Sequence, residues 1–325
     1  MEWLLKILKN SGIIHYNIME KRLWQHRTIF VRCCLIETDS NKERAGKIEM
    51  IQDIYPHRFD NSFFSKREAE DGDSLLIYTD NGEILVRRDS RDDTMFPQVR
   101  ELKGSELTYL FSIDGKAYFG LREKLEKLPE DFEFRNLKEM RSDSSIPIEL
   151  QFAAASGMHL YIWYRDNRFC GRCGKRLTYS DTERAMVCPD CRNIIYPRIN
   201  PAVIVGVING EKILLTKYRK GYKYFALIAG FTEFGESLEE CVRREVFEET
   251  GLRVKNIRYY RSQPWGIVQD ILVGFYCEVD GSSEINMDSN ELKLAGWYSR
   301  DEIVLQPDEM SLTGEMMRKF KRGEC

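Results

Sequence analysis

The sequence predicts an α+β protein of several domains, and three observations carry this prediction. Strand segments pair around Asn-Gly and Asp-Gly turns between about residues 51 and 145, two Cys-x2-Cys motifs follow a helical segment, and a glycine-rich loop then leads into a charged helix and further strands. We expect four parts, in this order: an N-terminal extension of unclear role (1–50), a β-rich domain (51–145), a helix with a cysteine ribbon (146–199) and a mixed α+β domain (200–325).

The composition favours a folded protein without a strong overall charge. The chain has 325 residues, 42% of them hydrophobic, and a formal net charge of -3, so it can bury proper cores and has no global field that would attract a polyanion. No apolar run reaches the ~18 residues of a membrane span. The opening segment is interrupted by Lys6 and Lys9, unlike a signal peptide. We therefore expect a cytoplasmic protein without a membrane partner.

Three hairpins and one helix are expected before the charged helix. Asn-Gly and Asp-Gly tolerate the positive φ angles of type I′ turns, which join antiparallel strands tightly. The segment 145–164 has a serine cap, a proline in the first turn and apolar residues on a helical period, so it predicts a helix. The hairpins are expected over 74–88 around Asn81-Gly82, over 108–121 around Asp114-Gly115 and over 202–218 around Asn209-Gly210.

Four of the nine cysteines have the spacing of a zinc ribbon. They form two Cys-x2-Cys pairs separated by fourteen residues, namely Cys170, Cys173, Cys188 and Cys191. Zinc prefers four tetrahedral ligands, and each pair can supply two thiolates from one turn. Four sulfur ligands leave no open position for chemistry, so we expect one structural zinc per chain. Lysine and arginine outnumber the acidic residues in this segment, which leaves nucleic-acid binding open, although a solvated cationic surface is the plainer interpretation.

The most specific pattern runs from Gly230 to Leu252 and reads G-x5-E-x7-R-E-U-x-E-E-x-G-U, where U is a bulky apolar residue. Ser237 with Glu240 forms a capping box that predicts the start of a helix. Gly251 predicts its end, because glycine readily adopts the left-handed conformation there.

Three glutamates of this helix lie at positions i, i+3 and i+4 and therefore on one face. Like charges this close destabilise a helix unless water or cations neutralise them. Hard carboxylate oxygens in this arrangement suit Mg²⁺ or Mn²⁺, and a neighbouring arginine can hold one carboxylate through two hydrogen bonds. The glutamates are Glu245, Glu248 and Glu249, and the arginine is Arg244.

The pattern resembles the Nudix box, and a cysteine ribbon directly before it resembles the NADH pyrophosphatase branch of that family. The resemblance extends from about Ala153 to Lys319. It implies an α/β/α sandwich with a mixed sheet, a homodimer, and hydrolysis of the diphosphate of NADH or NAD to AMP and nicotinamide mononucleotide in its reduced or oxidised form. It also implies removal of NAD caps from RNA.

The resemblance also assigns residues to the site. The Mg²⁺ or Mn²⁺ ligands would be the three box glutamates, Glu291 in the segment NELKLAGWYS, and the carbonyl of Ala229. One glutamate would accept the proton of the attacking water, with Glu248 and Glu291 as the candidates. Positions that match substrate contacts in the branch are Glu183, Tyr196, Phe231 and Thr313.

One segment departs from the branch, which has S-Q-P-W-P-F-P-x-S shortly after the box. Here the first four residues are kept, but two prolines, the phenylalanine and the last serine are replaced. We expect this segment to line the nucleotide less rigidly, because proline restricts the backbone and isoleucine cannot stack as a ring does. The residues concerned are Gln263, Pro264, Trp265, Gly266, Ile267, Val268, Gln269 and Asp270.

Two alternatives stay open at this point. The first is a Nudix diphosphatase for ADP-ribose, a dinucleoside polyphosphate or another nucleoside diphosphate derivative. The second is a zinc-ribbon RNA-binding protein with a non-catalytic Nudix domain, against which the four glutamates speak.

Overall fold

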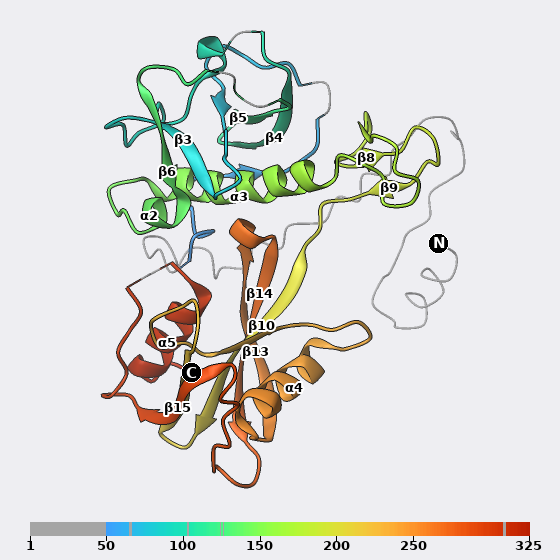
Figure 1. Ribbon diagram of the computed structural model, residues 1–325. Helices are drawn as coiled ribbons and strands as arrows, with labels where there is room; N and C mark the ends of the chain where they lie inside the picture. Colours follow the sequence, from blue (N-terminus) through green and yellow to red (C-terminus); the bar gives the residue numbers. More distant parts are fainter. Residues whose placement is uncertain (1–49, 65–66, 103, 124, 126, 308–309) are drawn as a thin grey trace, which may run out of the picture. The chain divides into compact units, whose positions relative to one another are not determined.

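The computed structural model describes residues 50–325 except 65–66, 103, 124, 126 and 308–309 (Figure 1). The extension expected over 1–50 therefore lies outside the described residues, apart from Met50. Among the described residues, no helix combines the length and the apolar character that crossing a membrane requires.

The N-terminal region contains two sheets. The larger has four strands in the order β1-β4-β5-β2, and the smaller pairs β3 with β6. Their bounds are β1 Phe59–Asp60, β2 Ser74–Leu75, β3 Glu83–Arg87, β4 Leu107–Ile113, β5 Lys116–Leu121 and β6 Phe132–Asn136, with a short 3-10 helix η2 at Val99–Glu101 and a helix α2 at Leu137–Arg141.

The hairpin expected over 108–121 is confirmed. Strands β4 and β5 pair antiparallel, and the turn residues Asp114 and Gly115 have φ angles of 51° and 84°. Both values fit the type I′ turn that Asp-Gly predicts.

The hairpin expected over 74–88 is formed only at its tip. Tyr78 bridges Ile84, and the amide of Leu85 donates to the carbonyl of Ile77 at 2.8 Å. Further from the turn the strands separate, because β2 pairs in parallel with β5 while β3 pairs with β6. Partners distant in the sequence thus replace the local pairing.

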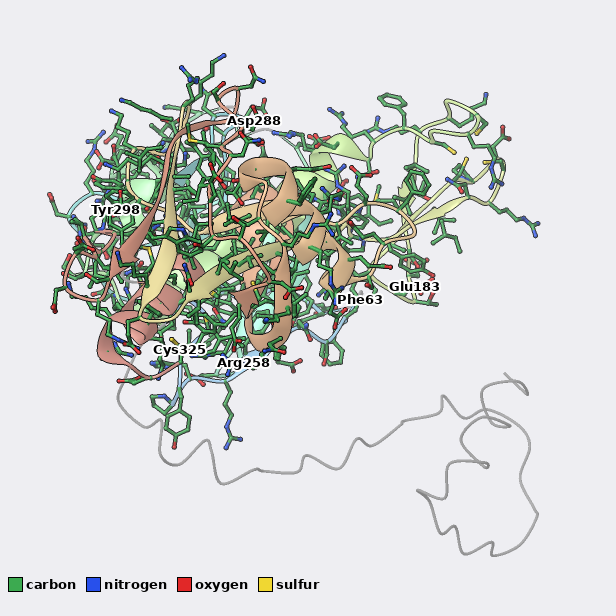
Figure 2. All side chains as sticks on the ribbon, turned by 90° about the horizontal axis from the view of Figure 1, so that it is seen from below. Phe63, Glu183, Arg258, Asp288, Tyr298 and Cys325 are labelled. Atoms are coloured by element: carbon green, nitrogen blue, oxygen red, sulfur yellow. The ribbon has the colours of Figure 1, made fainter. Side chains whose placement is uncertain are left out.

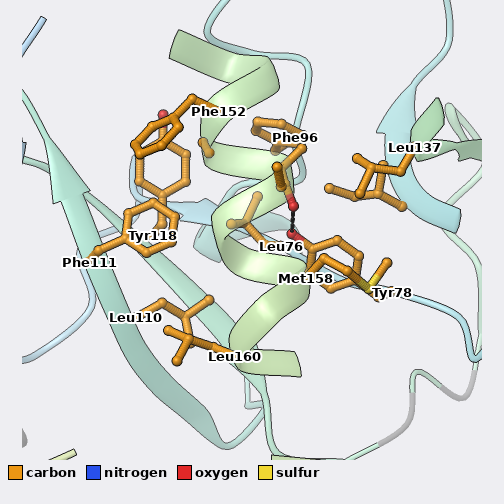
Figure 3. Packing of buried hydrophobic residues seen from close by; sticks show 14 of the residues in the cluster. Leu76, Tyr78, Phe96, Leu110, Phe111, Tyr118, Leu137, Phe152, Met158 and Leu160 are labelled. Carbon is orange, nitrogen blue, oxygen red and sulfur yellow. Dashed lines mark hydrogen bonds between the residues drawn. The ribbon is translucent and has the colours of Figure 1, made fainter. Parts of the chain in front are cut away.

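Helix α3 (Ile148–Asp166) confirms the helix expected in this region and packs into the core of the N-terminal region (Figures 1 and 3). Met158 and Leu160 lie among buried side chains of the β-strands, and the hydroxyl of Tyr78 donates to the carbonyl of Ala154 at 2.6 Å. This core also includes Cys188 of the ribbon. The β-rich segment, α3 and the ribbon therefore share one hydrophobic core.

The serine cap expected for this helix is wrong. Pro147 occupies the N-cap position, without a side-chain cap, and the helix begins at Ile148. The hydroxyl of Ser145 donates instead to the carboxylate of Asp143. The residue before a proline is disfavoured in helical conformation, so the chain enters the helix only after Pro147.

The ribbon leads into a six-stranded mixed sheet. The ribbon strands β7 (Thr178–Tyr179), β8 (Met186–Val187) and β9 (Ile194–Ile195) form a three-stranded sheet. The next sheet has the order β13-β14-β10-β11-β15, with β12 also paired to β10, and β10 runs parallel to β14. Its strands are β10 Asn200–Asn209, β11 Lys212–Tyr218, β12 Ile228–Phe231, β13 Val254–Trp265, β14 Asp270–Val279 and β15 Leu292–Ser299. The hairpin expected over 202–218 is confirmed by the β10–β11 pairing.

Two helices cover opposite faces of this sheet (Figure 1). Alternate residues of a strand point to opposite faces. Val203 and Val205 of β10 pack with α4 (Leu238–Thr250), whereas Ile204 between them packs with α5 (Leu312–Arg322). The expected α/β/α sandwich with a mixed sheet is therefore confirmed.

The ends of α4 match the sequence pattern. The hydroxyl of Ser237 accepts from the amide of Glu240 at 3.2 Å, and the amide of Ser237 donates to the carboxylate of Glu240 at 2.8 Å. Gly251 ends the helix with a φ of 70°. This capping fixes where the helix begins and ends.

Candidate functional site

Arg244 organises the acidic face of α4. Its guanidinium makes two hydrogen bonds to the carboxylate of Glu236, at 2.8 and 2.9 Å, and donates to Glu245 at 2.7 Å and Glu248 at 3.1 Å. It also donates to the carbonyl of Phe231 at 2.9 Å, at the end of β12. The hydrogen bonds from Arg244 to Glu236 lower the pKa of Glu236 to about 2. One guanidinium thus ties the loop, the helix and β12 together, as a planar group with five donors can.

Glu249 is the buried member of the acidic group. Glu249 is 1% exposed, and neither of its carboxylate oxygens has a hydrogen-bond partner among the described residues. Burial, followed by the negative charges of Glu291 and Glu245, raises its pKa to about 8, although the Ala229 backbone and the Tyr218 hydroxyl act in the opposite direction. Burying a charged carboxylate without partners costs free energy, and a bound cation would offset this cost.

Glu245 lies against β12. A β-carbon built on Gly230 would be 1.9 Å from its carboxyl carbon, so only glycine leaves room for this side chain. Burial raises the pKa of Glu245, whereas Arg244 lowers it. Glu248 is more open, with 59% of its side chain exposed. The three box glutamates therefore differ in environment although they share one helical face.

Glu291 reaches the same place from a distant part of the chain. The loop before β15 is attached to the end of α4, because the amides of Asp288 (labelled in Figure 2) and Asn286 donate to the carbonyls of Glu249 and Thr250, each at 2.9 Å. The amide of Arg219 donates to the carbonyl of Glu291, also at 2.9 Å. The negative charge of Glu291 is the second cause of the raised pKa of Glu249.

The acidic group fits hard divalent cations by the chemistry of its donors. It offers carboxylate oxygens of graded exposure around a buried carboxylate without partners, beside the β12 backbone at Ala229. Oxygen donors of this kind suit Mg²⁺ and Mn²⁺. The side chains that would hold such ions are Glu245, Glu248, Glu249 and Glu291.

The four ribbon cysteines lie together. Their sulfur atoms are all within 4.8 Å of one another, with Cys170 and Cys191 3.6 Å apart and Cys173 and Cys188 3.4 Å apart. Zinc bonds of about 2.3 Å in a tetrahedron separate sulfur atoms by about 3.8 Å, so the quartet fits one zinc ion. It is the only such group of metal-ligating side chains within 4.8 Å among the described residues.

The two halves of the quartet have the same backbone. The amide of Gly174 donates to the carbonyl of Cys170 at 2.8 Å, and the amide of Arg192 donates to that of Cys188 at 3.0 Å. The donor residue is left-handed in each turn, with φ of 73° for Gly174 and 57° for Arg192. This repeated turn points both thiols of a pair to one centre.

The residues assigned to the substrate by resemblance fall in separate places. Tyr196 and Glu183 (labelled in Figure 2) meet on the ribbon, where the tyrosine hydroxyl donates to the carboxylate at 3.1 Å. Phe231 ends β12 and is 55% exposed. Thr313 lies in the first turn of α5 and is half-buried.

The segment that departs from the branch joins the six-stranded sheet to the N-terminal region. Ile267, in the short 3-10 helix η3 (Gly266–Val268), packs against the core that contains α3. A β-carbon on Gly266 would lie 2.2 Å from the carbonyl oxygen of Ala155 in α3. The guanidinium of Arg141 lies 4.5 Å above the ring of Trp265, whereas Pro264 and Val268 are exposed.

Gln269 connects three elements around this junction. It is 2% exposed and left-handed, with a φ of 63°. Its side chain accepts from Arg198 at 3.0 Å and donates to the carbonyl of His159 in α3 at 3.3 Å. Its carbonyl accepts from the amide of Asn200 at 2.9 Å.

Asp270 and Gln263, two other buried polar residues of this segment, also form hydrogen bonds within the protein. Asp270 accepts from the side chain of Asn200 at 3.1 Å, and burial raises its pKa. Gln263 is fully buried and accepts from the amide of Leu312 at 2.8 Å, at the start of α5. The hydrogen bonds of these polar side chains therefore stabilise the fold.

Two residues of the acidic site have no assigned role in the sequence analysis. Glu236 is the first fixed glutamate of the Nudix box pattern, and this position indicates a role; in the structure it pairs with Arg244. Tyr218 ends β11, and its buried hydroxyl has no hydrogen-bond partner among the described residues. No short-range pattern marks this tyrosine, because it meets Glu249 only through the folded sheet.

Family comparison gives two adjacent matches. Residues 165–196 match the NADH pyrophosphatase zinc ribbon domain, and residues 198–320 match the NUDIX domain. The boundaries coincide with the ribbon and the six-stranded sheet with its two helices.

Curated relatives match the same part of the chain. The NAD-capped RNA hydrolase NudC of Citrobacter koseri is 45% identical over 157 residues, which are 47% of this chain and 60% of the relative. The enzyme of the same name from Escherichia coli is 44% identical with the same coverage. The chain thus spans about three fifths of the length of these relatives. A NUDIX hydrolase crystal structure from Nitrosomonas europaea is 22% identical, with a TM-score of 0.42 over 48% of this chain and 91% of that one.

Proposed function

Since residues 165–196 are an NADH pyrophosphatase zinc ribbon and residues 198–320 a Nudix domain, we propose that this chain is a metal-dependent hydrolase that cleaves the diphosphate of NADH or NAD. The products are AMP and nicotinamide mononucleotide, reduced or oxidised according to the substrate. The same cleavage removes an NAD cap from RNA, the activity in the name of the relatives.

The observation that carries the proposal is the buried carboxylate of Glu249. Both its oxygens lack partners, and the charges of Glu291 and Glu245 act on it. A purely structural acid at such a site would have a hydrogen-bond donor or a counter-ion. This environment therefore favours cation binding over a non-catalytic scaffold.

Divalent ions bound by Glu245, Glu248, Glu249 and Glu291 would supply charge neutralisation for the diphosphate and a more acidic water. The chain itself contributes geometry. Arg244 holds Glu245 and Glu248 and leaves the remaining carboxylate oxygens for ligands. Glu248 and Glu291, both exposed, are the candidates to accept the proton of the attacking water.

We assign substrate contacts to residues in four places in this proposal. The exposed ring of Phe231 would stack on a base. Glu183 and Tyr196 would bind the substrate from the ribbon, and Thr313 from α5. In the segment 263–270, the exposed side chains of Pro264 and Val268 and the half-buried Trp265 would contact the ligand, while Gln263, Gly266, Ile267, Gln269 and Asp270 would shape the backbone of that wall.

Localisation and assembly belong to the same proposal. We place the enzyme in the cytoplasm, as a homodimer with one structural zinc per chain and with Mg²⁺ or Mn²⁺ as the catalytic ion. Size-exclusion chromatography with light scattering and elemental analysis test the assembly and the zinc.

The decisive experiment measures AMP release from NADH, NAD, ADP-ribose and an NAD-capped RNA, each with Mg²⁺, with Mn²⁺ and without added metal. We expect metal-dependent AMP release that is fastest with NADH, NAD or the capped RNA. Faster cleavage of ADP-ribose than of any NAD-containing substrate would support the alternative diphosphatase. The absence of turnover with every substrate and both metals would overturn the enzymatic proposal.

A further inference from the structure

A large cleft lies between the N-terminal sheet, α3 and the zinc ribbon. Its volume is about 1380 Å³, and its lining includes the segment from Leu76 to Asn81 between β2 and β3, one face of α3 and the ribbon segment around Thr178. None of the four acidic metal-site residues lines it. Pockets for single small molecules usually hold about 300–1,000 Å³, so this cleft has room for a longer ligand.

Tyrosine rings form the wall of the cleft on α3 and the ribbon. The rings of Tyr164 and Tyr179 lie 5.2 Å apart at 37°, and Tyr161 lies 5.3 Å from the ring of Tyr78. Tyr161, Tyr164 and Tyr179 are only partly buried, with part of each ring packed on the hydrophobic core. Packing on the core fixes the rings before a ligand arrives, which lowers the entropic cost of stacking on them.

Arginines flank these rings. The guanidinium of Arg122 lies 4.3 Å above the ring of Tyr179 and is also held by Thr108 and Glu106. Arg168 and Arg176 line the ribbon end of the cleft, are exposed, and form no ion pair with another described residue.

The lining also contains acidic residues. Asp80 is engaged by the hydroxyl of Tyr161 at 3.0 Å and by Arg165 at 3.4 Å. Glu123 and Asp181 also line the cleft. The cleft is therefore not strongly basic, and its affinity for an anion must depend on stacking as well as on charge.

Planar rings that share one cleft with the exposed guanidinium groups of Arg168 and Arg176 suit a ligand with alternating bases and phosphates. Proteins that bind single-stranded nucleic acid combine aromatic platforms with cationic groups along the backbone. The ribbon hairpin that provides Tyr179 continues through the turn that holds Glu183, which pairs with Tyr196. We propose that this cleft binds single-stranded RNA, namely the nucleotides that follow an NAD cap. This inference rests on the proposed function, since it concerns the RNA part of that substrate.

RNA binding can be tested separately from catalysis. The probe is a fluorescent, uncapped single-stranded RNA of about ten nucleotides, within the site sizes of such proteins, and the readout is fluorescence anisotropy without added divalent metal. We expect Tyr179→Ala to weaken binding about 5- to 150-fold, the value of one lost ring–base stack. Tyr179→Phe, which keeps the ring, should bind like the unmodified protein.

The charge contribution has its own readout. Each lost phosphate contact to a single strand should reduce the slope of log affinity against log salt by about 0.7, so Arg176→Ala should flatten that slope by about this amount. Arg172→Ala is the matched control, because it removes an exposed arginine of the same ribbon that does not line the cleft. It should leave the slope unchanged, and all four variants should hydrolyse NADH like the unmodified protein.

Several results would overturn the proposal. These are unmeasurable RNA binding by the unmodified protein, equal binding by Tyr179→Ala with normal zinc content, or an equal loss in Arg172→Ala and Arg176→Ala. Competition by AMP as effective as that by unlabelled RNA would also overturn it, because the site would then recognise a single nucleotide. Failure of NADH hydrolysis with intact RNA binding would instead contradict the proposed function alone.

Discussion

At the residue scale, the environment of Glu249 dominates the chemistry of the candidate site. Its carboxylate is buried beside two other acidic side chains, and Arg244 bonds to the neighbouring Glu245 and Glu248 rather than to it. A carboxylate in this position is costly to keep charged in the absence of a cation. The same property makes it a strong ligand when a cation is present.

The first prediction concerns turnover. Glu249→Gln keeps the shape of the side chain but removes its charge, so it should lower turnover of the preferred substrate by at least about a hundredfold under saturating Mg²⁺ or Mn²⁺. Steady-state kinetics give the value, and circular dichroism checks that the fold is retained. Turnover near that of the unmodified enzyme would contradict the metal-binding role. Glu239→Gln, on the exposed first turn of α4, is the matched control and should change little.

The second prediction concerns the pH dependence of stability. The pKa of Glu249 is about 8 in the folded, metal-free protein, against a usual value of 4.5. The folded state therefore binds more protons than the unfolded state between these values, and the free energy of unfolding contributed by this group falls as pH rises. Glu249→Gln removes this effect.

Thermal unfolding without added divalent metal measures it. At about pH 5 the two proteins should differ little, and at about pH 8 the unmodified protein should be the less stable of the two. Adding Mg²⁺ at the higher pH should stabilise the unmodified protein and not the variant. A melting difference that is the same at both pH values would show that the charge of Glu249 is not the cause.

At the scale of the elements, α4 and the zinc ribbon are both defined by short-range patterns. The capping box at Ser237 and the left-handed Gly251 fix the length of α4. The two ribbon turns repeat one backbone geometry at Gly174 and Arg192. Short-range backbone geometry thus positions the glutamates of α4 and the cysteines of the ribbon.

The third prediction tests the ribbon. Cys188→Ser should release the zinc and lower the melting temperature, because zinc in such sites contributes on the order of 10 kcal/mol to folding. The effect should reach the N-terminal core, since Cys188 is fully buried in it. Elemental analysis and thermal unfolding provide the measurements.

Cys325→Ser is the control for this experiment, because Cys325 is an exposed free thiol outside the quartet. It should retain one zinc per chain and the melting temperature of the unmodified protein. A stable Cys188→Ser protein that is free of zinc would remove the structural role.

At the scale of the whole described unit, the junction between η3 and α3 joins the six-stranded sheet to the N-terminal region. Ile267 packs on the N-terminal core, and Gln269 connects α3 with the strand that leaves the ribbon. Gln52 adds a further link, because its side chain donates to the carbonyl of Ser262 at 3.0 Å. The junction therefore fixes the ribbon relative to the sheet through both packing and hydrogen bonds.

The fourth prediction tests this junction. In Gly266→Ala the added methyl group would meet the carbonyl oxygen of Ala155 at 2.2 Å, so the two elements must move apart. We expect a loss of about 1–3 kcal/mol in the free energy of unfolding, the usual cost of overpacking. Chemical denaturation provides the measurement. Gly72→Ala is the control, because no atom lies within 4 Å of its added carbon and its backbone is not left-handed. Equal stability of the two variants would contradict close packing at the junction.

The local sequence by itself determined the parts of this protein that depend on neighbouring residues. Asp114-Gly115 and Asn209-Gly210 place two hairpins, Ser237 and Gly251 bound α4, and the cysteine spacing groups four thiols. These features follow from backbone preferences and side-chain bonds that reach only a few residues along the chain. The continuous apolar run from Ala202 to Ile208 in β10 likewise matches the burial of this strand on both faces of the sheet.

The tertiary structure alone decided which distant segments meet. The strands expected to pair over 74–88 separate because β2 finds a partner in β5 and β3 in β6. Tyr218 and Glu291 approach Glu249 only because β11 and β15 are neighbours and the loop before β15 is bonded to α4. Gln269 is buried because α3 covers it. Such contacts depend on burial and pairing between distant segments; Gln269 and His159, for example, are 110 residues apart in the sequence. The spacing of residues within a short motif does not predict them.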